Sequence, residues 1–502
     1  ERIAGEQMGG GEWEGRIERR ERVEGAGQEV SFAQQRLWFL DQLEPGSAFY
    51  NVPAAIRLKG ELDVEALQRS LSEVVRRHEV LRTHFAESEG QPVQIIGEAE
   101  PLPIPLIDLS ALGRTEREAE AMAYASEEAR RPFDLSTGPL FRVQLLRLSH
   151  EEHILLVTMH HIVSDGWSTG VLIREVAALY EAYSQGLESP LEELPIQYAD
   201  YAAWQRNWLQ GEALEQQLAY WRQQLSGTLP VLELPTDKPR PAVLSYRGAS
   251  LSVKLSADLT GSVKQLSRQQ NCTLYMTMLA AFESLLCRES GATEILVGTA
   301  TANRNRAETE GLIGFFVNMV VMRGDLRGQP SFVELLRQVR EVALGAYAHQ
   351  EVPFEKLVEE FGGERKVSHA PLFQVAFGVN NTPQEEIRMG TLQTRLLPIE
   401  NETGRYDLTL WVEEVGESLK ATWYYNTDLF SAERMQRMAA RYEKLLASAV
   451  AEPEARVSAL DILSDEEKKQ QMIEEQGLLE SNVRMLKIAR RKAVNQDRLT
   501  QA

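Results

Sequence analysis

Hydrophobic and polar positions divide this chain into two α/β portions. In the first portion, residues 63–78 and 171–183 place apolar side chains at helical spacing, which predicts two helices that face a core. Residues 154–159 are apolar and partly β-branched, which predicts a strand buried on both faces. Residues 140–148 alternate between apolar and polar as a neighbouring strand, and residues 80–85 are expected to form another strand.

The second α/β portion follows a connection of different composition. Residues 196–225 are rich in aromatic residues and glutamine and predict one or two helices, and the prolines between residues 230 and 241 predict an extended loop. Beyond the loop, the expected helices are residues 256–269, 273–286, 332–349 and 354–361, and the expected strands are residues 294–298, 317–323, 373–379, 408–415 and 419–425. This order of elements indicates two similar lobes.

The same patterns give a division into domains. We expect an N-terminal lobe over residues 29–195, connecting helices and loop over residues 196–242, and a C-terminal lobe over residues 243–463. Residues 1–28 are rich in Gly, Glu and Arg and predict a linker, and residues 464–502 are highly charged and predict a linker helix. The chain begins without an initiator Met or an apolar signal region, so we expect it to be a piece of a longer protein.

Composition narrows the class of protein. A length of 502 residues exceeds what one hydrophobic core organises, in agreement with two lobes. The net charge of −20 disfavours nucleic acid as a partner, and no apolar run approaches the roughly 18 residues of a membrane-spanning helix. The cysteines Cys272 and Cys287 lack metal-ligand spacing and are expected to be packing residues in a reducing cytoplasm.

Two adjacent histidines, His160 and His161, end the predicted buried strand. An imidazole there has an ordinary pKa of about 6.5 and exchanges a proton near neutrality. Because side chains alternate along a strand, one histidine is expected to be structural and the other is a candidate catalyst. Asp165 is placed to fix the loop, by pairing with an arginine or by capping the next helix, and Gly166 lets the backbone turn or a ligand approach. The alternative is a pair of core histidines followed by a simple turn.

Other chemistries fit this stretch poorly. A zinc site needs a third ligand in register, and none is evident, so no metal is expected. A nucleophilic Ser164 or Ser168 would lack the Gly-x-Ser-x-Gly elbow, and the chain has no phosphate-binding Gly-x-x-x-x-Gly-Lys-Ser/Thr loop.

The run from His160 to Gly166 resembles the His-His-x-x-x-Asp-Gly motif of condensation domains of nonribosomal peptide synthetases, within the chloramphenicol acetyltransferase-like superfamily. The flanking blocks resemble the other motifs of that family in the family's order; they are residues 31–40, 77–83, 198–206, 313–318, 349–354 and 368–374. The resemblance covers about residues 28–462. Trp167 and Ser168, together with residues 31–40, resemble the subtype that joins an L-configured donor to an L-configured acceptor.

The resemblance implies an α/β fold of two chloramphenicol acetyltransferase-like lobes, arranged as a V-shaped pseudo-dimer with a central tunnel. It implies amide bond formation between a donor acyl or peptidyl thioester and the α-amine of an acceptor aminoacyl thioester. Donor and acceptor peptidyl carrier domains would present both on phosphopantetheine arms, and the domain itself would bind no cofactor. Residues 1–28 would then link to a preceding carrier domain, and the tail to an adenylation or tailoring domain. A monomer without nucleic acid or membrane partners is expected.

The resemblance also implies roles for individual residues. His161 would contact the attacking amine as a general base or as a positioning group, and His160 would face the core. The other expected site residues are Asp165 and Gly166 in the motif, Arg304 as the structural partner of Asp165, and Asn318, Trp167 and Ser168 at the substrate. The remaining histidines expected to be structural are His78, His84, His349 and His369.

Two alternative functions stay open at this point. The same residues suit an ester-forming acyltransferase with an alcohol acceptor. A degenerate domain that recruits a tailoring enzyme is the second alternative, and the intact histidine motif argues against it.

Overall fold

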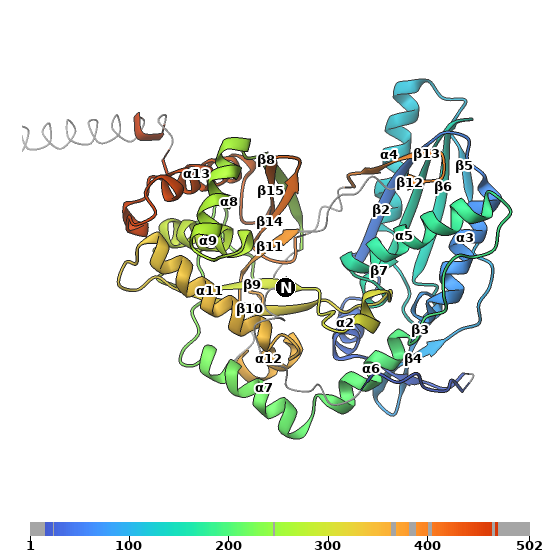
Figure 1. Ribbon diagram of the computed structural model, residues 1–502, viewed down its shortest axis with the longest axis horizontal. Coiled ribbons are helices and arrows are strands. Elements are labelled where there is room, and N and C mark those ends of the chain that lie inside the picture. The colour runs from blue at the N-terminus through green and yellow to red at the C-terminus, as the bar shows by residue number, and fades with distance from the viewer. Residues whose placement is uncertain are drawn as a thin grey trace, which may run out of the picture.

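Two six-stranded sheets, one in each lobe, organise the chain in the computed structural model (Figure 1). The structure describes residues 16–23, 25–243, 246–362, 368–380, 388–399, 404–463 and 467–469. The two lobes are joined at one end and diverge toward the other, as a V (Figure 1). The α/β class and the two-lobed chloramphenicol acetyltransferase-like architecture are therefore confirmed, and the central tunnel stays a prediction.

Strand β7 (Glu152–His160) lies inside the N-terminal sheet, antiparallel to both of its neighbours. The sheet runs β12 (Arg388–Met389), β13 (Leu392–Leu397), β2 (Asn51–Lys59), β7, β6 (Phe141–Ser149) and β5 (Leu106–Asp108). One face packs on α3 (Val64–Arg77) and α5 (Gly166–Tyr183), and α4 (Arg114–Arg130) covers the other. Both faces of β7 are thus buried, as predicted, which fixes the direction of the strand end.

A small sheet corrects the prediction for residues 80–85. A 3₁₀ turn, η1 (Glu79–Arg82), precedes β3 (Thr83–Ser88), which pairs with β4 (Gln91–Ile96) and through it with β1 (Gln28–Glu29). The Thr83 hydroxyl donates to Glu79 O at 2.8 Å, and Gln197 Oε1 accepts from Glu79 N at 3.0 Å. These side-chain hydrogen bonds pair the backbone O and N–H of Glu79 and hold the turn, so residues 80–82 do not pair with β4 as strand.

The C-terminal sheet and its helices form the largest of the hydrophobic cores. Its order is β10 (Asn318–Asp325), β9 (Glu294–Thr301), β11 (Val375–Asn380), β14 (Leu408–Val415), β15 (Ser418–Asn426) and β8 (Gly248–Lys254). Its helices are α8 (Ala257–Gln269), α9 (Leu274–Ser290), α10 (Ala307–Glu310), α11 (Phe332–Ala348), α12 (Phe354–Phe361) and α13 (Ala432–Ala451), with a 3₁₀ turn η3 (Val457–Ala459). The predicted helices and strands of this portion are confirmed. Strand β8 and helix α13 were not anticipated.

Two helices connect the lobes, α6 (Tyr198–Trp208) and α7 (Gly211–Gln224), followed by the expected loop. The division at residue 243 is wrong for two segments. Strand β13 pairs with β2 of the N-terminal sheet, and residues 312–317 place apolar side chains in the N-terminal core. Strand β13 covers the edge of β2, which would otherwise expose unpaired backbone groups.

The predicted linker over residues 1–28 is also wrong from residue 16 onward. Ile17 is 2% exposed within the N-terminal core, and Arg22 makes ion pairs with Glu79 and Asp200, each at 2.9 Å. Burial of an apolar side chain and two ion pairs holds this segment against the lobe. Residues 1–15 and nearly all of residues 464–502 lie outside the described residues. Within the described part, no helix is long and apolar enough to cross a membrane.

Candidate active site

His160 and His161 stand where β7 passes into a 3₁₀ turn, η2 (His161–Val163). The backbone N–H groups of His160 and His161 donate to Leu140 O at 3.0 Å and to Tyr50 O at 2.7 Å, so both residues are held by neighbouring chain. His161 Nδ1 lies 2.7 Å from Ser164 O, and a carbonyl only accepts. Nδ1 therefore carries the proton in the neutral ring, and Nε2 keeps its lone pair.

His160 has the opposite tautomer. Its Nδ1 accepts from Ile162 N at 3.1 Å, so the proton of the neutral ring is on Nε2. Only 2% of His160 is exposed. Burial, with the charges of His161 and Arg142, lowers its pKa to about 3, and the ring is neutral near pH 7. His160 thus faces the interior, as expected.

His161 is partly exposed and lies edge-on to Phe315, with ring centres 4.6 Å apart. Burial lowers its pKa, and the positive charge of Arg405 lowers it further, against the opposing effect of Asp165. A neutral imidazole with a free Nε2 can accept a proton or a hydrogen bond from an amine.

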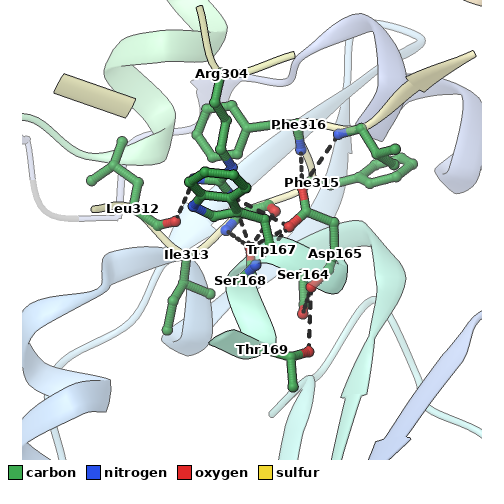
Figure 2. A network of polar contacts seen from close by, with 12 residues as sticks. Ser164, Asp165, Trp167, Ser168, Thr169, Arg304, Leu312, Ile313, Phe315 and Phe316 are labelled. Carbon is green, nitrogen blue, oxygen red and sulfur yellow. Dashed lines mark hydrogen bonds and ion pairs between the residues drawn. The ribbon is translucent and has the colours of Figure 1, made fainter. Parts of the chain in front are cut away.

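Asp165 is the centre of a buried network between the lobes (Figure 2). Its Oδ1 accepts from Ser168 N at 2.8 Å, from Ser168 Oγ at 2.7 Å and from Arg304 Nη2 at 3.2 Å. Its Oδ2 accepts from Phe316 N at 3.0 Å and from Val317 N at 3.3 Å. Asp165 therefore caps α5 and also pairs with an arginine, which joins the two roles offered as alternatives from the sequence.

Arg304 reaches this carboxylate from the loop after β9. Its Nη1 donates to Thr309 O at 2.5 Å and Leu312 O at 2.7 Å, and its guanidinium lies 4.0 Å from the centre of the Phe316 ring. The predicted contact with Asp165 is present. The guanidinium also holds residues 304–312 in one conformation, which the sequence did not indicate.

Ser168 and Asn318, which are predicted to contact substrate, make their hydrogen bonds to the protein in this structure, and their substrate-binding role stays a prediction. Ser168 is fully buried, and its Oγ bonds to Asp165 and to the backbone N and O of Gly314. The Asn318 amide group donates to Gln350 O and Val352 O, each at 2.7 Å, and its oxygen accepts from a backbone N–H. The polar atoms of both side chains thus bond to backbone groups. Ser168 at the start of α5 holds the loop at Gly314, and Asn318 at the start of β10 holds the segment before α12.

Trp167 and Gly166 differ from these buried residues. Trp167 is 40% exposed, and its indole N–H donates to Glu310 O at 2.9 Å, so a substrate-facing role stays a prediction. Gly166 begins α5 and has no positive φ, and its predicted role in the site stays a prediction. A Cβ at Gly166 would meet nothing within 4 Å, which is compatible with the close approach of a ligand.

Several site residues were missed. Arg405 places its guanidinium 5.2 Å from the centre of the Tyr50 ring, beside the segment that holds His161. The Tyr198 hydroxyl donates to Phe315 O at 2.6 Å and bonds to Ser31 Oγ at 2.9 Å. The only sequence signal for Tyr198 and Ser31 was their position in two family motifs, which meet here in space. Nothing marked Arg405.

His78 and His349, which are predicted to be structural, both contact neighbouring side chains. His78 Nε2 lies 3.0 Å from Glu175 Oε2, and its Nδ1 accepts from Ile313 N at 3.2 Å. His349 stacks on Tyr220 with ring centres 4.1 Å apart. In the described ranges, no group of three His, Cys, Asp or Glu side chains is placed to hold a metal ion.

The chain has two α/β lobes, with His161 at the end of a strand in one lobe and a buried Asp165–Arg304 pair where the lobes meet. This arrangement is that of a two-lobed chloramphenicol acetyltransferase-like protein. The model of the condensation domain family matches residues 26–472. This chain belongs to the condensation domain family of nonribosomal peptide synthetases.

Relatives agree with this assignment. The chain is 50% identical over 443 residues to a component of the linear gramicidin synthase of Brevibacillus parabrevis, with 88% of this chain and 6% of the relative covered. It is 42% identical to phosphinothricin tripeptide synthetase PhsC of Streptomyces viridochromogenes, over 87% of this chain and 40% of the relative. The chain thus spans a small part of these synthetases.

Solved structures share the fold. The X-domain from teicoplanin biosynthesis superposes with a TM-score of 0.81 at 29% identity, over 89% of this chain and all of that one. The first condensation domain of the calcium-dependent antibiotic synthetase superposes with a TM-score of 0.73 at 21% identity, over 88% of this chain and all of that one.

Proposed function

We propose that this chain joins two carrier-bound acyl groups through an amide bond, with His161 Nε2 facing the attacking amine. The α-amine of the acceptor forms the new C–N bond at the donor thioester carbonyl, and the C–S bond then breaks to release the donor thiol. The amine proton leaves through Nε2 if His161 is a base. Donor and acceptor carrier domains, each with a phosphopantetheine arm, are the partners that this reaction requires.

One observation supports the proposal above the others: no described residue bonds to Nε2 of His161, so its lone pair is open to a substrate. The bond from Nδ1 to Ser164 O fixes the ring, and burial and Arg405 keep it neutral. A neutral amine is already nucleophilic, so His161 acts as base or as positioning group. Orienting two tethered reactants contributes up to roughly 7–11 kcal/mol of the rate enhancement by itself.

The test is single-turnover peptide bond formation between a loaded donor carrier and a loaded acceptor carrier. We expect His161→Ala to abolish or strongly slow product formation. The matched control is His150→Ala, since His150 lies in the turn between β6 and β7, away from the strand end that carries His161. Unchanged product formation by His161→Ala would contradict the proposal. His161→Gln separates the roles, because glutamine positions an amine but does not accept its proton.

Substrate preference needs a separate assay. We propose the subtype that joins an L-donor to an L-acceptor, which the Trp167 and Ser168 ending supports by resemblance. Matched carriers loaded with L- and D-configured donors test it, and faster turnover of the D-donor would reject it. Offering amine and hydroxyl acceptors in the same assay tests the ester-forming alternative.

The likeness to an X-domain favours one rival function, recruitment of a tailoring enzyme. One solved structure is a complex of the X-domain and OxyB from teicoplanin biosynthesis, and it superposes with a TM-score of 0.80. The intact His160, His161 and Asp165 of this chain favour catalysis instead. Recruitment would gain support only if the wild-type chain made no product from loaded carriers and bound a tailoring enzyme.

A further inference from the structure

A cavity of about 410 Å³ lies in the C-terminal lobe, between α9, α11 and the edge strand β10. Helix α11 lies beside both α9 and β10 (Figure 1). The volume is within the range of small-molecule pockets, which is roughly 300–1,000 Å³. None of the lining residues belongs to the network around His161 and Asp165, so the proposed reaction does not explain this cavity.

The lining combines an apolar wall with a charged rim. The apolar side chains of the wall are Leu279, Met322, Leu335, Val339 and Val342. At the rim, Arg323 pairs with Glu294 at 2.8 Å and Arg327 pairs with Asp325 at 2.7 Å. Both arginines of the lining are therefore neutralised by carboxylates of the lining, and neither offers an unpaired positive charge to an anion.

Glu283 places a buried carboxyl group at the cavity. The residue is 1% exposed and lines the cavity from α9, and its Oε2 has no hydrogen-bond partner among the residues that the structure describes. Burial raises the pKa of this carboxyl to about 8. A Cβ at Gly324 would stand 2.6 Å from Glu283 Oε2, so glycine at this position on β10 leaves room for the carboxyl. A buried carboxyl oxygen without a partner is costly and calls for a ligand or another explanation.

We infer that this cavity binds a primary alkylammonium ion, with the ammonium group against the Glu283 carboxylate and the alkyl body along the apolar wall. A carboxylate and an ammonium group form a charge-assisted hydrogen bond that a buried site strengthens. A metal ion fits less well, because no group of three metal-ligating side chains is found among the described residues.

Binding moves one proton. Below the raised pKa of Glu283 the free site is a neutral acid, and an arriving ammonium ion displaces its proton to solvent. Affinity for the ion therefore rises with pH and levels off once the pH passes about 8.

The probes are n-hexylammonium chloride and the neutral analogue 1-hexanol, each titrated into the intact chain by calorimetry. We expect the ammonium ion to bind the wild type, and Glu283→Gln to weaken it about tenfold to a hundredfold, the range for a hydrogen bond to a charged group. Hexanol should bind both proteins equally. Repeating the titration in buffers of different ionisation enthalpy should show proton release with the wild type near pH 7 and none with Glu283→Gln.

A second variant keeps the test decisive if Glu283→Gln folds poorly. Val342→Trp fills the cavity from the partly buried face of α11 and leaves Glu283 intact, so it should abolish binding of both probes. Peptide bond formation should be unchanged in both variants. Equal affinity of hexylammonium for the wild type and Glu283→Gln, binding without proton release, or no binding to the wild type would each overturn the inference.

Discussion

Replacing Asp165 by asparagine tests whether the buried junction holds the site together. The carboxylate is 2% exposed and accepts from the four groups Ser168 N, Ser168 Oγ, Phe316 N and Val317 N, besides the guanidinium of Arg304. Asparagine has the same size but turns an NH₂ group toward donors. It also leaves the Arg304 charge, in a residue 7% exposed, without its counter-ion. Breaking a buried pair from one side costs about 3–5 kcal/mol, and we expect Asp165→Asn to lower the free energy of unfolding of the N-terminal lobe by that amount.

The assay is equilibrium unfolding in urea, followed by tryptophan fluorescence and far-ultraviolet circular dichroism. Trp167 lies in this junction, so its fluorescence reports on the lobe directly. The control is Asp108→Asn, because Asp108 pairs with Arg147 at 3.5 Å with its side chain 48% exposed, and such pairs contribute about 0–1 kcal/mol. A loss for Asp165→Asn within about 1 kcal/mol of the control would refute the structural role of the pair.

Three further predictions concern the neighbouring residues. Arg405→Met removes a positive charge that lowers the pKa of His161, so the acid limb of the pH–rate profile should move to higher pH. Arg405→Lys keeps the charge and should leave the limb in place. An unmoved limb in Arg405→Met would contradict the assigned charge effect. His160→Phe leaves a buried backbone N–H without its acceptor and should cost about 1–3 kcal/mol in urea unfolding, more than His160→Asn, which keeps an acceptor; equal losses would argue against that bond. Gly314→Ala would drive a Cβ into the ring of Tyr198 and should cost about 1–3 kcal/mol by overpacking, and a normal melting temperature would disprove the tight contact.

Elements with strong periodicity were predicted well. Helix α3 buries Leu67, Leu71 and Val74 at helical spacing, and β7 is buried along nearly its whole length. Helix α4 was not anticipated, since its buried face is mostly alanine and gives little contrast with the exposed face. Residues 80–82 of the turn η1 were predicted as strand, because a hydrogen bond that holds this turn comes from Gln197, more than a hundred residues away.

Some residues of the candidate site could be assigned from the sequence, and others could not. His161 and His160 could be assigned to different environments, since one follows the other at the end of a buried strand. The hydrogen bonds of Ser168 and Asn318 to the protein were not foreseen, because a motif position does not say whether a hydroxyl or amide faces a cavity or a backbone group. Arg405 was missed because its effect on His161 depends on the packing of distant segments.

Sequence alone determined the class of fold, the buried strand and the histidine run, because periodicity and local chemistry are properties of neighbouring residues. Only the tertiary structure decided that β13 completes the N-terminal sheet and that the backbone N–H groups of Phe316 and Val317 meet Asp165 across 151 and 152 positions of chain. Alternation along a strand tells which face is buried but not which strand lies beside it. The tautomer of His161 and the unpaired carboxyl of Glu283 follow from those distant contacts, and both depend on burial that no single segment creates.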